Sequence, residues 1–198
     1  VVLLNCMHPE STQAKSLSKQ LSAKKRDELY DEIMEKAVAI GIGYATPERI
    51  DEINILQATY EAMRSAINQL DPKPDILLND AVTIPLVDIT QVPIIKGDAK
   101  SVSIAAASII AKVTRDRLME EYAKEYPQYG FEKHKGYGSK EHIEAIKKYG
   151  PCEIHRKTFI KNFIELYDSG STGAYYRIHC VFVHPDGKEK IIYTCEGL

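Results

Sequence analysis

Residues 94–117 read IIKGDAKSVSIAAASIIAKVTRDR, and this segment is the most informative one about the fold. It predicts a short apolar strand, a polar loop and then a long apolar helix. Ser101 or Ser103 can cap the helix, because a hydroxyl accepts hydrogen bonds from the first free backbone N–H groups. Residues 104–110 carry almost no polar side chain. Such a helix is normally buried on all sides, so the rest of the domain has to cover it.

The loop that leads into this helix is charged. Lys96 and Lys100 place two cations on either side of Asp98. A charged loop at the end of a buried helix indicates a functional site on a rigid scaffold. The same pattern fits a core helix with an ordinary solvated entry loop, and the local sequence does not decide between the two.

The composition is that of a globular protein with one substantial core. The chain has 198 residues, of which 44% are hydrophobic and 27% charged,. A net charge of −2 gives no global cationic field, so a polyanion would need a local basic patch,. The four cysteines are widely scattered, which argues against a zinc site and favours a reduced, cytoplasmic chain,. We expect neither a signal peptide nor a membrane span.

Hydrophobic periodicity predicts strands that alternate with helices before residue 94. Ser22 and Thr46 are the expected caps of two helices, and the first helix is expected to end near Ile40,. Strands are expected at 1–4, 41–45, 75–80 and 92–95, and helices at 23–40 and 47–70. Strand–helix alternation predicts an α/β domain with a largely parallel sheet.

Residues 126–142, YPQYGFEKHKGYGSKEH, interleave aromatic and cationic side chains. This combination suits a nucleic-acid strand, because rings stack on bases or sugars and cations attract phosphates. A loop packed by its own tyrosines explains the composition equally well. Ser139 is the expected cap of a short helix that runs to Tyr149,.

The character of the chain changes at residue 169. SGSTG (169–173) reads as a linker, and alternating residues on both sides of Asp186-Gly187 predict a β-hairpin,. We therefore expect a main domain over 1–168, followed by a linker and an added β-hairpin over 169–198.

Three motifs then stand out together: KGDAKSVSIAAASIIAKVTRDR, PQYGFEKHKGYGSKEH and YGPCEIHRKTF. Their order and density resemble bacterial ribonuclease HII over residues 18–159. The resemblance implies a ribonuclease-H-like fold, a mixed sheet flanked by helices with a C-terminal helical part. It also implies a monomeric, metal-dependent endonuclease that cuts the RNA strand of RNA–DNA hybrids and ribonucleotides embedded in DNA.

The resemblance also implies roles for single residues. Asp80, in LLNDAV, and Asp98, in KGD, match the third and fourth acids of the family, which are catalytic residues and ligands of two Mg²⁺ or Mn²⁺ ions,. Tyr137, in GYG, matches the tyrosine that packs on the sugar at the RNA–DNA junction.

Three further positions are expected to bind substrate. Ser18 and Lys19 match a pair that approaches the phosphates, and Lys96 is also a motif position. Cations at such places would receive the phosphates that flank the cleavage point.

One family motif does not occur in the printed sequence. The family's first strand carries Asp-Glu-x-Gly-Arg-Gly, which supplies two of its four acids. Asp80 and Asp98 alone would bind metal weakly, because affinity falls with each carboxylate removed. We therefore expect weak or absent hydrolysis unless another chain supplies the acids. The alternatives are an inactive hybrid-binding module and a chimeric or engineered scaffold without a substrate.

Overall fold

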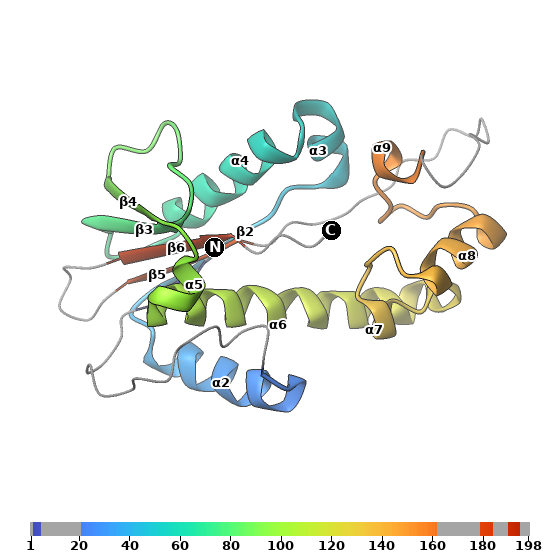
Figure 1. The fold of residues 1–198 in the computed structure, drawn as a ribbon, viewed down its shortest axis with the longest axis horizontal. Coiled ribbons are helices and arrows are strands. Elements are labelled where there is room, and N and C mark those ends of the chain that lie inside the picture. Colours follow the sequence, from blue (N-terminus) through green and yellow to red (C-terminus); the bar gives the residue numbers. More distant parts are fainter. Residues whose placement is uncertain (1, 5–20, 162–178, 184–189, 195–198) are drawn as a thin grey trace.

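The computed structural model describes residues 2–4, 21–161, 179–183 and 190–194 (Figure 1). In these ranges one mixed sheet has the strand order β1-β5-β6-β3-β4, and β2 pairs with β5. The strands are β1 (Val2–Leu4), β2 (Ile40–Gly43), β3 (Ile76–Asp80), β4 (Thr90–Ile94), β5 (His179–Val183) and β6 (Lys190–Thr194).

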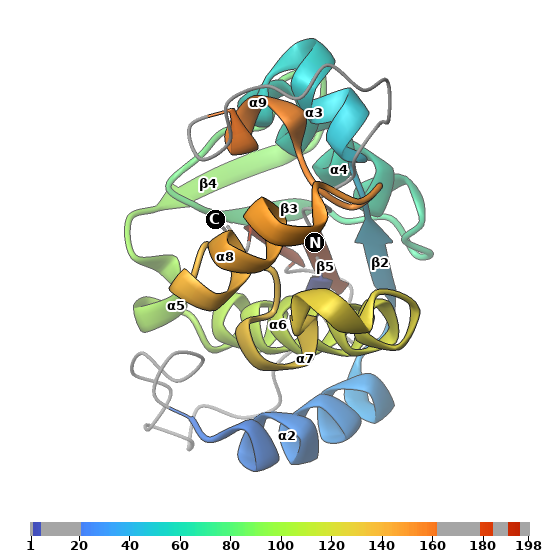
Figure 2. The same ribbon diagram turned by 90° about the vertical axis from the view of Figure 1, so that its right-hand side faces the viewer.

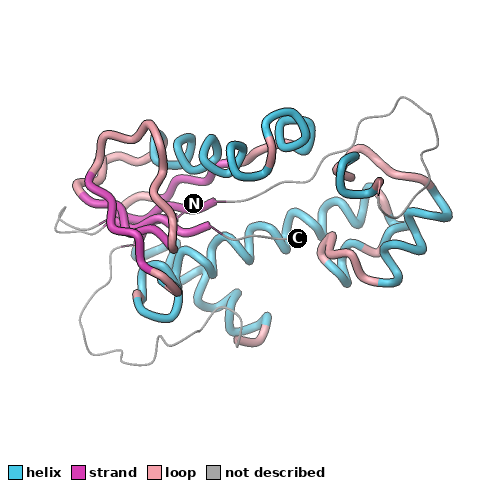
Figure 3. Tube along the Cα trace, turned by 45° about the horizontal axis from the view of Figure 1, so that its top comes forward, coloured by secondary structure: helices cyan, strands magenta, loops and turns pink. Residues whose placement is uncertain are grey.

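Helices cover the sheet in layers. Figures 1 and 2 show α4 on one face and α6 on the other, with α2 packed on the outer side of α6. Figure 3 shows the sheet at one end of the molecule and the last helices at the other, with α6 joining them. The helices are α2 (Ala23–Lys36), α3 (Pro47–Ile53), α4 (Ile55–Asn68), α5 (Gly97–Lys100), α6 (Val102–Glu125), η1 (Pro127–Tyr129), α7 (Phe131–His134), α8 (Lys140–Tyr149) and α9 (Lys157–Ile160).

The predicted long helix is α6, and its first half is the centre of the core. Every residue from Ser103 to Ala111 is buried. Ser101, and not Ser103, is the cap, because the Ile104 N–H donates to its Oγ at 3.4 Å. Within the described ranges, no helix is both long and apolar enough to span a bilayer.

The packing of β2 against α4 depends on two glycines. A β-carbon at Gly41 or Gly43 would overlap the backbone carbonyl oxygens of Ala66 and Ala62, respectively. Alanines on the helix and glycines on the strand therefore bring the two backbones into direct contact, which explains the GIG sequence in this strand.

Two helix predictions were partly wrong. The helix expected over 23–40 ends at Lys36, because Ile40 begins β2 and pairs with β5. The helix expected over 47–70 breaks at Asn54, whose φ is 68°. The Asn54 side chain accepts hydrogen bonds from the Leu56 and Gln57 N–H groups at 3.0 and 3.1 Å. It therefore restarts the helix as α4, in the manner of an N-cap.

The predicted hairpin strands are confirmed as the antiparallel pair β5 and β6. They lie inside the sheet, since β6 also pairs in parallel with β3. The expected turn at Asp186-Gly187 lies outside the described residues. The division of the chain near residue 169 stays a prediction.

We predict that Gly43→Ala destabilises the fold by about 2 kcal/mol or more, because the helix backbone cannot move away from the added methyl without opening the core. Urea unfolding followed by circular dichroism measures this change.

Gly138→Ala is the matched control, because a β-carbon at Gly138 meets no atom within 4 Å. Its expected effect is within about 0.5 kcal/mol. Equal losses in the two variants would contradict the proposed close packing.

Candidate active site

Asp80 stands at the end of a strand in the sheet, as its sequence context predicts. It is the last residue of β3 and lies beside Ile94, the last residue of the parallel strand β4. The Gly97 N–H donates to Asp80 Oδ1 at 2.7 Å. This hydrogen bond ties the carboxylate to the loop that follows β4.

Asp98 lies directly after that hydrogen-bonded glycine, in the first turn of α5. It is half-buried, and the preceding Lys96 is exposed and adopts a left-handed conformation with φ 56°. A β-carbon on Gly97 would lie 3.3 Å from Asp80 Oδ1 and even closer to Ile104. The chain turns tightly here, and the Gly97 N–H between Lys96 and Asp98 donates to Asp80, so both residues lie at the same end of the sheet as Asp80. Figure 1 shows α5, which begins at Gly97, beside this part of the sheet.

The donor set at this end of the sheet is small. Two carboxylates are hard oxygen ligands of the kind that Mg²⁺ and Mn²⁺ prefer. Among the described residues, no group of three or more histidine, cysteine, aspartate or glutamate side chains could hold a metal ion. Asp80 and Asp98 thus fit part of a divalent-metal site and do not complete one.

A groove of about 680 Å³ runs between α2, α6 and α7. Tyr137 lies in it with 37% of its surface exposed, and Lys112 Nζ is 5.4 Å from the centre of the tyrosine ring. The other cations that line the groove are Arg26, Arg117, Lys133 and Lys135. A tyrosine beside cations provides a stacking surface next to a phosphate-binding one.

Several of these cations pair with carboxylates across the groove. Arg117 contacts Asp27 at 3.2 Å, and both side chains are about half exposed, at 47% and 54%. Exposed pairs of this kind contribute little to stability, so an incoming phosphate can replace the carboxylate at low cost.

The structure supports both interpretations of residues 126–142. Tyr129 and Phe131 are buried at 4% and 1% exposure, and the Tyr129 hydroxyl donates to the Gly150 carbonyl at 2.7 Å. Tyr126 is half-buried, whereas Tyr137 is exposed in the groove. Most aromatic side chains of the segment build its core, and Tyr137 is the one that faces the groove.

Two buried histidines lie behind Tyr137, and sequence reasoning missed them. His142 and His155 are exposed by only 1% and 0%, and their Nε2 atoms are 2.9 Å apart. They are 13 residues apart in the sequence, on α8 and in the following turn, so no periodic pattern pairs them. The available signal was weak: each histidine has one isoleucine and one charged residue as its neighbours, in IHR and EHI.

Burial keeps these imidazoles neutral. Desolvation lowers the pKa of His142 to about 4, and His134 nearby acts in the same direction. Desolvation and His142 together lower the pKa of His155 to about 3. Burial also raises the pKa of the Cys152 thiol, which lies beside His155, to about 11. The thiol is therefore protonated at neutral pH.

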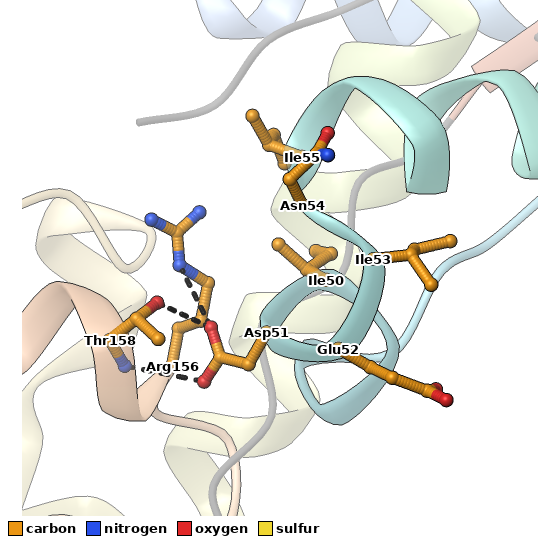
Figure 4. A pocket seen from close by; sticks show the side chains of 8 residues that line it. All are labelled: Ile50, Asp51, Glu52, Ile53, Asn54, Ile55, Arg156 and Thr158. Carbon is orange, nitrogen blue, oxygen red and sulfur yellow. Dashed lines mark hydrogen bonds and ion pairs between the residues drawn. The ribbon is translucent and has the colours of Figure 1, made fainter.

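The segment that carries His155 is fixed to α3 through Asp51 (Figure 4). Asp51 accepts hydrogen bonds from the N–H and the hydroxyl of Thr158. It also forms an ion pair with Arg156, whose Nε lies 3.5 Å from Asp51 Oδ1. These contacts hold the segment with Arg156 and Thr158 against α3.

The structure brings only some of the predicted site residues close to one another. Asp80 lies at one end of the sheet, and Lys96 and Asp98 flank the Gly97 that donates to it. Tyr137 lies elsewhere, beside Lys112 of α6. Ile104, behind Gly97, and Lys112, beside Tyr137, are separated on α6 by about 12 Å of helix,. Ser18 and Lys19 lie outside the described residues.

A mixed sheet between helices, with Asp80 at the end of one parallel strand and Asp98 just beyond the end of its neighbour, is consistent with an α/β protein of ribonuclease-H-like fold. The family model described as Ribonuclease HII matches residues 15–162, and the chain belongs to this family.

Three similar curated proteins carry the name "Ribonuclease HII". The protein from Lachnoclostridium phytofermentans is 71% identical over 145 residues, which are 73% of this chain and 57% of that protein. The protein from Clostridioides difficile is 62% identical over 147 residues, 74% of this chain and 58% of that protein. The Bacillus subtilis protein is 62% identical over 142 residues, 72% and 55% of the two chains. The chain thus spans little more than half the length of these relatives.

We predict that the folded state loses stability in acid through the two buried histidines. The pKa of each is about 6.5 in the unfolded chain and lower in the folded one, at about 4 and 3,. The stabilisation is therefore present above pH 6.5 and is lost as the pH falls towards 4, because the unfolded state takes up protons that the folded state excludes. Urea unfolding should show a loss of about 2–4 kcal/mol between pH 7 and pH 5.

His142→Asn provides the comparison, since it removes one of the two groups. Its unfolding free energy should depend less steeply on pH than that of the wild-type chain. Parallel pH profiles of the two proteins would contradict the assignment.

Proposed function

We propose that the chain carries part of the active site and substrate groove of a metal-dependent endonuclease. Its substrates are RNA–DNA hybrids and DNA with embedded ribonucleotides, and the polypeptide of residues 1–198 hydrolyses them weakly by itself. The observation that carries the proposal is the placement of Asp80 and Asp98 at one end of parallel strands, joined through the Gly97 N–H, in a chain of the ribonuclease HII family.

The two aspartates supply the chemistry. Cleavage of a phosphodiester builds charge on the attacking water, the phosphate and the leaving oxygen, and divalent ions held by carboxylates stabilise that charge. Asp80 and Asp98 would hold Mg²⁺ or Mn²⁺. The hydrogen bond from the Gly97 N–H holds the Asp80 carboxylate in one orientation beside the loop that carries Asp98,.

The groove supplies the substrate-binding surface. Lys96 at the carboxylates and the cations around Lys112 would receive phosphates, as would Ser18 and Lys19,. Tyr137 would pack on the sugar of the ribonucleotide, where contact with the 2′-hydroxyl distinguishes RNA from DNA.

Weak hydrolysis follows from the size of the acidic set. Asp80 and Asp98 are two carboxylates, and the printed sequence contains no Asp-Glu-x-Gly-Arg-Gly motif to add two more. Each carboxylate removed lowers the affinity for a hard cation. Fusion of a segment with this motif ahead of residue 1 should therefore raise the rate.

We predict that Asp80→Asn and Asp98→Asn each lower nicking by on the order of 100-fold or more, because an amide neither neutralises nor tightly binds a divalent cation. The measurement is a single-turnover nicking assay in Mg²⁺ and in Mn²⁺. The substrate is a DNA duplex with one ribonucleotide, and the assay uses the chain alone and the chain fused to the motif.

Asp75→Asn is the matched control, because Asp75 is exposed just before the opposite end of β3. It should nick at the wild-type rate. Nicking that survives both active-site changes would come from a contaminating nuclease and would overturn the proposal.

We predict that Tyr137→Ala weakens binding to a duplex with one ribonucleotide by about tenfold and leaves binding to an all-DNA duplex nearly unchanged. Loss of stacking removes about 1–3 kcal/mol per contact. Fluorescence anisotropy without metal measures both affinities, and it separates a binding module from an enzyme because no cleavage is needed.

Tyr44→Ala is the control for loss of an exposed ring, since Tyr44 is 50% exposed at the end of β2. Absence of hybrid binding in the wild-type chain would leave the scaffold as the remaining interpretation.

A further inference from the structure

The exposed ring of Tyr137 is attached to an unusual backbone turn. The two residues before it are left-handed, with φ 50° at Lys135 and 80° at Gly136. A left-handed conformation is unfavourable for a lysine and persists only where surrounding contacts enforce it. The contacts around this turn therefore decide where the Tyr137 ring lies.

His134 provides one of these contacts. Its Nδ1 lies 3.2 Å from the Gly136 N–H, and its Nε2 lies 2.7 Å from the Tyr129 carbonyl oxygen. A backbone N–H can only donate and a carbonyl oxygen can only accept. Nδ1 is therefore the acceptor, and Nε2 carries the proton.

His142 provides the second contact, through the residue itself. Its Nδ1 lies 2.8 Å from the Tyr137 carbonyl oxygen, which also accepts from the Ser139 N–H at 2.8 Å. Since the carbonyl oxygen accepts, His142 Nδ1 must carry the proton. A neutral His142 then has an acceptor at Nε2, which faces His155 Nε2 at 2.9 Å.

His155 completes the chain of hydrogen bonds. The Cys152 N–H lies 2.9 Å from His155 Nδ1, so Nδ1 accepts and Nε2 carries the proton towards His142,. The Cys152 Sγ lies 3.0 Å from the same Nδ1. Both ends of this series of hydrogen bonds are thus fixed, by a backbone donor at Cys152 and a backbone acceptor at Tyr137. Only one direction of donation satisfies every group.

We infer that His134, His142 and His155 are positioning residues for Tyr137. Each is held in one neutral tautomer, and together they fix the backbone before and after Tyr137 so that its ring presents to the groove. The inference rests on the proposed function, because the orientation of the Tyr137 ring affects activity only where the ring contacts a ribonucleotide. Arg115, buried in α6, supports the same turn by donating from Nη2 to the Lys135 carbonyl at 3.3 Å.

The geometry favours this role over simple core filling. The His134 and His142 rings stack on each other, with 4.3 Å between their centroids and an angle of 17° between their planes. Phe131 packs edge-on against both rings, at 5.8 and 5.4 Å. Apolar side chains could fill the same volume, but they would remove the second donor of the Tyr137 carbonyl and the hydrogen bond from the Gly136 N–H to His134,.

The first test concerns the tautomers and needs no activity. Long-range ¹H–¹⁵N correlation spectra of the wild-type chain at pH 7.5 should show His142 as the Nδ1–H form, and His134 and His155 as Nε2–H forms. Spectra of His142→Asn and of a corresponding variant at each of the other two positions assign the signals. An Nε2–H form or a charged imidazole at His142 would overturn the inference.

The second test separates positioning from mere folding. In His142→Asn the amide nitrogen can take the place of Nδ1 and still donate to the Tyr137 carbonyl. In His142→Gln the longer side chain reaches towards the Nε2 position, and the donor at Nδ1 is lost. The two variants remove the same imidazole and differ by one methylene.

The readout is the preference for a duplex with one ribonucleotide over an all-DNA duplex, measured by anisotropy without metal. His142→Gln should lower this preference by about two- to tenfold, and His142→Asn should keep it within about twofold. Equal preference in the two variants, with both folded by circular dichroism, would overturn the positioning role.

Different results would overturn the proposed function and the inference about the histidines. A wild-type chain with the assigned tautomers and no preference for the ribonucleotide would overturn the proposed function and with it the role of the histidines at Tyr137, while the hydrogen-bond chain itself would stand. A wild-type chain with the preference and other tautomers would overturn only the inference.

Discussion

The burial of the first half of α6 is the constraint on which the rest of the structure depends. From Ser103 to Ala111 every residue is shielded from water. A helix of this kind has no face of its own for solvent, so other elements must cover it on all sides. The sheet packs on one side and α2 on another, while α5 packs at its start and α7 near its far half. The order of layers in the molecule follows from this requirement.

The carboxylates and the groove lie at the two ends of this buried segment. At the start of α6, the buried Ile104 supports Gly97, and the tight turn presents the two carboxylates at the surface. Beyond Ala111 the helix emerges from the core and carries Lys112 to the groove. A rigid apolar segment therefore fixes the distance between the turn at Gly97 and Lys112, the residue that lies over the Tyr137 ring,.

Local signals in the sequence were sufficient where the interaction itself is local. Ser101 caps α6 and Ser139 caps α8 through hydrogen bonds between residues three positions apart in the sequence. The strand that ends at Asp80 is a compact apolar run. The end of α2 at Lys36 depends on β5, which is more than a hundred residues away in the sequence. The histidine pair likewise depends on how α8 packs against the following turn, so residue type and spacing could not identify it.

The 24 residues of α6 also restrict how the length of the chain can change. One residue inserted between Ile104 and Lys112 would turn the second half of the helix by about 100° and shift it by about 1.5 Å. Lys112, which lies over the Tyr137 ring, would then be displaced relative to Ile104, which lies behind Gly97, although every side chain would be unchanged. The number of residues along this helix therefore sets the relative position of the two regions.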